Sequence, residues 1–115
     1  MESIPKFLQG ILAFNGEGYD KGKLLSSTMA YTVPSDKRSQ LIYFRAGNAS
    51  AELICLSLYR DGKLMRLFPV GAKEASHVSL AVVEDLTPDS RLEVHISAPV
   101  GVAGTVVVDI GLLEI

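Results

Sequence analysis

Hydrophobic and polar residues alternate along most of this chain, and residues 91–97 show the pattern most clearly. Leu92, Val94 and Ile96 fall on one side of an extended segment, and the polar residues between them fall on the other. Residues 104–115 alternate in the same way and are rich in β-branched residues, which favour strands. The pattern therefore predicts two strands, each with one buried and one outward side.

The same period of two, less regular, predicts six further strands. They cover residues 7–14, 25–33, 41–46, 53–60, 63–68 and 76–83, with a helical turn as an alternative at 82–86. In the third of these, strict alternation predicts Ile42 and Phe44 on the buried side and Leu41 and Tyr43 on the opposite side.

Turn-forming residues separate the predicted strands. Asp61 and Gly62 tolerate the positive φ of a type I′ turn and predict a hairpin. Residues 48–50 match the glycosylation sequon, which we interpret as a turn, and residues 15–22, with three glycines, predict the most mobile loop.

Short strands at a spacing of roughly 8–12 residues, with no convincing helix, predict an antiparallel β-sandwich or barrel. A chain of 115 residues has room for one domain, so we assign residues 1–115 to a single all-β sandwich of about eight strands. A jelly roll is the first interpretation, and an immunoglobulin-like Greek key is the second.

Charge and composition exclude some classes of function. Eleven basic and thirteen acidic residues are dispersed along the chain, which argues against binding to a nucleic-acid backbone. No apolar run is long enough for a signal peptide or a membrane span, so we expect a cytoplasmic or virion-associated protein.

The sequence predicts no catalytic site, cofactor or metal. His77 and His95 have no ligand spacing, although they would become neighbours if their strands paired. Cys55 lies in an apolar strand, where thiols are usually inert, and no serine lies in a recognisable catalytic motif. A minimal metalloenzyme on a cupin-like barrel is therefore a third hypothesis, behind two that require no catalysis.

The first hypothesis is a structural or binding module that associates with itself or with another protein. If one side of each strand fills the core, an unusual number of large apolar residues remain on the other side. The residues expected at such an interface are Leu41, Tyr43, Val83, Val107 and Leu113.

The second hypothesis is a module that binds a saccharide or another small ligand. The chain has no tryptophan, so stacking on a sugar ring would depend on Tyr19 in the glycine-rich loop and on Tyr59.

The chain resembles small β-sandwich structural proteins of tailed phages in four segments, residues 31–38, 47–50, 53–63 and 87–94. Those proteins share a TVP-x-x-K strand entry, an N-x-S turn and a hairpin of the form P-x-D/S-x-L-E-V, as found here over roughly residues 25–115. The apolar segment 104–115 departs from that pattern. The resemblance implies a capsid, tail or adaptor protein that acts by self-association.

Overall fold

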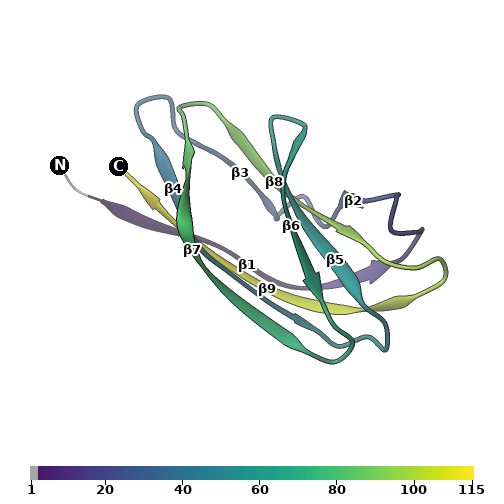
Figure 1. The fold of residues 1–115 in the computed structure, drawn as a ribbon. Helices are drawn as coiled ribbons and strands as arrows, with labels where there is room; N and C mark the ends of the chain where they lie inside the picture. Colours follow the sequence, from purple (N-terminus) through teal and green to yellow (C-terminus); the bar gives the residue numbers. More distant parts are fainter. Residues whose placement is uncertain (1–2) are drawn as a thin grey trace.

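The computed structural model describes residues 3–115, with the backbone alone described at 81–84, and it contains nine strands and no helix in that range (Figure 1). The strands are β1 (Ile4–Asn15), β2 (Lys23–Leu24), β3 (Ala30–Thr32), β4 (Ser39–Asn48), β5 (Ile54–Arg60), β6 (Lys63–Val70), β7 (Ala75–Leu86), β8 (Arg91–Ser97) and β9 (Ala103–Glu114). The described residues thus include no helix that could cross a membrane. The alternative of a helical turn at residues 82–86 is wrong, because this segment belongs to β7.

The strands form two antiparallel sheets that pack face to face. Sheet A has the order β1-β9-β4-β7, and sheet B has the order β2-β8-β5-β6. β3 also pairs with β8, nearer the start of that strand than β2 does. Together β2 and β3 therefore occupy one edge position, so the nine strands fill eight positions.

The pairing pattern is that of a jelly roll. β1 pairs with β9, β2 and β3 pair with β8, β4 pairs with β7, and β5 pairs with β6. The chain is thus one long hairpin that is rolled into two sheets, with its tip at the β5–β6 turn. The predicted antiparallel β-sandwich is confirmed, and of the two predicted topologies the jelly roll fits this strand order.

The tip of the long hairpin has the predicted turn. Asp61 and Gly62 have φ values of 50° and 81°. Two consecutive residues with positive φ are the mark of a type I′ turn, whose twist matches that of the strands it joins.

The core lies between the sheets. Leu92, Val94 and Ile96 are buried as the alternation predicts. Phe44 of sheet A and Phe68 of sheet B stack with their ring centroids 4.1 Å apart and an angle of 8° between the ring planes. This aromatic pair joins the two layers.

One strand departs from the predicted alternation. The pairing of β4 with both neighbours shifts register between Leu41 and Tyr43, and against β9 the single extra residue Ile42 marks a β-bulge. Because a bulge adds one residue, it changes which side each later residue faces. Leu41 and Phe44 are therefore both fully buried, whereas Ile42 is 41% exposed. The prediction that Leu41 faces outward and Ile42 inward is wrong.

Candidate functional site

The face of sheet A that points away from sheet B presents side chains in rows across the strands. The strand register aligns Gln9 of β1 with Asp109 of β9, and Asp109 with Arg45 of β4. Arg45 is in turn opposite His77 of β7. We call this face the outer face of sheet A and this set of four the polar row.

Tyr43 ties the polar row together. Its hydroxyl donates a hydrogen bond to Asp109 Oδ1 at 3.1 Å, and Gln9 Nε2 donates to the same oxygen at 3.2 Å. The tyrosine ring meets the His77 ring edge-on at 6.0 Å and lies 5.8 Å from the Arg45 guanidinium. Burial, followed by the hydrogen bond to Asp109, raises the pKa of the Tyr43 hydroxyl, so Tyr43 acts as a neutral donor.

A glycine fixes the position of the Tyr43 ring. A Cβ atom at Gly111 would lie 2.0 Å from Tyr43 Cε2, so the ring lies directly over this glycine. A larger residue at 111 would force the ring off the sheet. Sequence reasoning offered no signal for this contact, because the two residues come together only when β4 pairs with β9.

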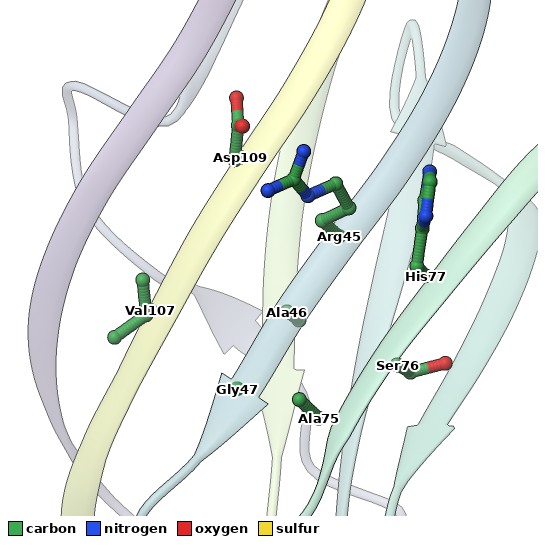
Figure 2. Close-up of a pocket in the computed structure, with 8 residues that line it drawn as sticks. All are labelled: Arg45, Ala46, Gly47, Ala75, Ser76, His77, Val107 and Asp109. Carbon is green, nitrogen blue, oxygen red and sulfur yellow. The ribbon is translucent and has the colours of Figure 1, made fainter.

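An apolar row lies beside the polar row. Ile11 of β1 is aligned with Val107 of β9, and these side chains are 75% and 48% exposed. The row continues to Gly47 and Ala75, and the missing side chain at Gly47 leaves a hollow of about 330 Å³ (Figure 2). The hollow is lined by Arg45, Ala46, Gly47, Ala75, Ser76, His77, Val107 and Asp109.

The five residues predicted for an interface lie in different parts of the structure. Tyr43 and Leu113 are half-buried and Val107 is exposed, all on the outer face of sheet A. Leu41 belongs to the core, because of the bulge described above. Val83 lies outside the residues whose side chains the structure describes.

Two exposed apolar residues of β1 were missed as interface candidates. Phe7 and Ile11 are both odd-numbered residues of β1, and they project from the outer face of sheet A. Their alternation with Leu8 and Leu12 was the available signal, but a strand with apolar residues on both sides does not reveal which side is buried.

The outer face of sheet B carries a second set of contacts. The rings of Tyr59 and His95 stack with centroids 4.1 Å apart. Glu93 pairs with His95 at 3.2 Å and accepts a hydrogen bond from Arg91 Nε at 3.1 Å, and these two partners, His95 first, lower the pKa of the Glu93 carboxyl. Two exposed leucines adjoin this group, Leu24 opposite His95 and Leu64 opposite Tyr59, and Leu53 and Leu67 are exposed elsewhere, just before β5 and in β6.

The residues predicted for ligand or metal binding are not brought together. Tyr19 donates a hydrogen bond to the Leu53 carbonyl oxygen at 2.7 Å, beside the start of β5, whereas Tyr59 lies near the end of that strand. His77 and His95 are on different sheets, so they are not neighbours. Within the part of the chain that the structure describes, no three histidine, cysteine or acidic side chains cluster as metal ligands would.

A buried acid–tyrosine pair connects the two sheets. Tyr31 of β3 donates a hydrogen bond to Glu114 Oε2 of β9, and Glu114 is almost completely buried. Burial, followed by this hydrogen bond, raises the pKa of Tyr31 to about 12. The Tyr31 hydroxyl and the Glu114 carboxyl are hydrogen-bonded to each other, so we assign this pair a structural role.

Because of the Tyr31–Glu114 pair, we expect the free energy of unfolding to fall at alkaline pH. The folded protein keeps the Tyr31 proton up to a pH of about 12, whereas the unfolded chain releases it near pH 10. The free energy of unfolding should therefore fall between these pH values, by at most about 3 kcal/mol. Urea titrations at a series of pH values from 9 to 12 measure this slope, and Tyr31→Phe should flatten it. Parallel pH profiles for the two proteins would contradict the assignment.

Comparison with known proteins gives no family for this chain. No protein-family profile and no sequence of a characterised protein matches it. Among solved structures, a structure of infectious bursal disease virus, Gx strain, matches with a TM-score of 0.45 and 8% identity over 100% of this chain and 33% of the other. A Paenibacillus sp. cycloisomaltooligosaccharide glucanotransferase complexed with cycloisomaltoheptaose matches with a TM-score of 0.39 and 18% identity over 91% of this chain and 16% of the other. With both TM-scores below 0.5, neither likeness carries an argument about function.

Proposed function

We propose that this protein is a non-enzymatic structural or binding module that acts by self-association through exposed apolar residues of its β-sandwich. The observation that carries the proposal is the alignment of Ile11 with Val107 on the outer face of sheet A, where both are exposed. Isolated apolar residues are normal on a protein surface, but neighbouring ones on adjacent strands form a patch that favours contact with another surface.

The arrangement of charges on this face supports a contact between copies. The polar row beside the patch contains the acid Asp109 and the base Arg45. Because both signs occur on one face, two copies of the face can approach without net repulsion. An apolar centre with a polar border is also the usual anatomy of a protein interface. The resemblance to tailed-phage structural proteins agrees with such a role and would place the assembly in a virion.

Sedimentation equilibrium at micromolar concentrations tests self-association. We expect a mass that is a multiple of the 12.4 kDa chain. At least one of the variants Ile11→Lys, Val107→Lys and Leu67→Lys should lower this mass, because each places a charge in an exposed apolar patch. Val100→Lys is the matched control, since Val100 is exposed on the turn between β8 and β9 and belongs to neither the Ile11–Val107 patch nor the exposed leucines of sheet B. A wild-type protein that remains a monomer at every concentration would contradict the proposal.

A second candidate function is the binding of a saccharide or another small ligand in the hollow above Gly47. The hollow has the volume of a small ligand pocket and places Arg45, His77 and Asp109 around an apolar floor. This location differs from the predicted one at Tyr19 and Tyr59. A saccharide that raises the melting temperature of a strictly monomeric protein would favour this candidate over the first.

A further inference from the structure

The two sheets have four free edges, and three of them carry features that discourage pairing with another chain. The edges are β1 and β7 in sheet A, and β6 and the β2–β3 position in sheet B. Charged residues and prolines on an edge strand oppose the addition of a further strand. These features are Lys63, Arg66 and Pro69 in β6 and Lys23 in β2. In β7 the charges stand only near its end, at Asp85, but its pairing with β4 is irregular opposite Leu41–Tyr43, and such an irregularity also discourages the addition of a strand.

The free edge of β1 lacks this protection over most of its length. β1 has 12 residues, and β9 is its partner on one side only (Figure 1). Pro5 and Lys6 stand at its beginning, but residues 7–15 include no charged residue and no proline. A long, uncharged and apolar edge strand is a template for another strand.

Two residues show which backbone N–H and C=O groups of β1 face β9 and which face the free edge. Gly16 donates a hydrogen bond to the Val102 carbonyl oxygen at 2.6 Å, which continues the β1–β9 register beyond the end of β1. Even-numbered residues of β1 therefore bond to β9. Pro5, which has no N–H group, is odd-numbered, as expected for a proline whose nitrogen faces a free edge. The N–H and C=O groups of Phe7, Gln9 and Ile11 thus face outward along the open edge.

The sequence of this edge is complementary to itself. If two copies of β1 pair antiparallel about a two-fold axis at Gln9, then Gln9 lies opposite its own copy and Phe7 lies opposite Ile11 of the second copy. Both apolar side chains project from the outer face of sheet A, so the pair recurs on each side of the axis. Aromatic residues opposite β-branched residues stabilise antiparallel pairing.

We propose that β1 pairs through its free edge with β1 of a second copy of this chain, with the two-fold axis at Gln9, so that two A sheets form one continuous sheet. This inference rests on the proposed self-association and names the strand and the register that mediate it. The face of sheet A then extends across the dimer as a single surface.

A cysteine at the axis tests the register. In a Cys55→Ser background, which removes the only native cysteine, Gln9→Cys should form a disulfide-linked dimer on mild oxidation. Residues opposite each other in a hydrogen-bonded antiparallel pair have Cα atoms about 5.5 Å apart, within the range of a disulfide. Ala13→Cys is the matched control, because Ala13 lies on the same strand, edge and face and is also exposed. It would face Pro5 of the second copy rather than itself, so it should not cross-link. Equal cross-linking at both positions would overturn the register.

Charge variants separate pairing along the edge from contact between faces. Ile11→Lys, on the free edge, should raise the dimer dissociation constant by roughly tenfold or more, since each dimer contains the change twice. Val107→Lys, on the central strand β9, should leave the dimer intact. Circular dichroism and thermal melting establish that both variants fold.

The outcomes distinguish this inference from the function on which it rests. An oligomeric wild type whose mass falls with Val107→Lys but not with Ile11→Lys would overturn edge pairing and leave self-association through a face. A wild type that is monomeric at all concentrations would overturn both. Oligomers that dissociate with Ile11→Lys and cross-link at Gln9→Cys alone would support both.

Discussion

Asn48→Asp is expected to remove roughly 3–5 kcal/mol from the free energy of unfolding, a large share of the stability of a domain this size. Asn48 is 3% exposed, and its Nδ2 donates to the carbonyl oxygens of Glu52, Val70 and Gly71 at 2.8, 3.2 and 3.1 Å. An aspartate has almost the same shape but brings a buried negative charge against three acceptors and donates nothing at neutral pH.

Urea denaturation at pH 7 measures this loss, and Asn15→Asp is the matched control because Asn15 is exposed at the end of β1. The Asn48→Asp defect should become smaller as the pH falls, since a protonated carboxyl group can again donate one hydrogen bond. A variant as stable as the wild type at pH 7 would show that these three carbonyl groups do not need the amide.

Phe44→Ala is the second change with a large expected effect, a loss of about 3–5 kcal/mol. Phe44 is fully buried, and its ring stacks on Phe68 across the interface of the two sheets. Truncation leaves a cavity that two rigid sheets cannot close, and it also removes the ring-to-ring contact.

Val100→Ala is the control for Phe44→Ala, because the Val100 side chain is exposed on a turn and contributes little to the core. We expect its melting temperature to change much less than that of Phe44→Ala when both are followed by circular dichroism. Similar losses for the two variants would mean that the stacked pair does not hold the layers together.

The sequence predicted those parts of the fold that depend on neighbouring residues. Strict alternation placed Leu92, Val94 and Ile96 in the core, and the pair Asp61–Gly62 predicted a hairpin with the correct turn. In both cases the sequence pattern and the element that it predicts lie within the same few residues. The strand and the turn can therefore be predicted without knowledge of the remaining chain.

Features that depend on distant residues escaped prediction. The bulge at Ile42 arises where β4 pairs with β7 and β9, and nothing within the segment marks it. The residues around Asn48 predicted a turn, but two of the three carbonyl groups that it binds come from the end of β6 and just beyond. The patch of Ile11 and Val107 likewise exists only because the first and last strands pair.

The pairing of β1 with β9 also has a consequence for how the protein is made. Ile4 is opposite Glu114, so a nascent chain that leaves the ribosome N-terminus first exposes β1 long before the strand that covers one side of it has been synthesised. During that interval both edges of this strand, which is uncharged over residues 7–15, are open, and neighbouring nascent chains on one messenger RNA would present the same strand to each other.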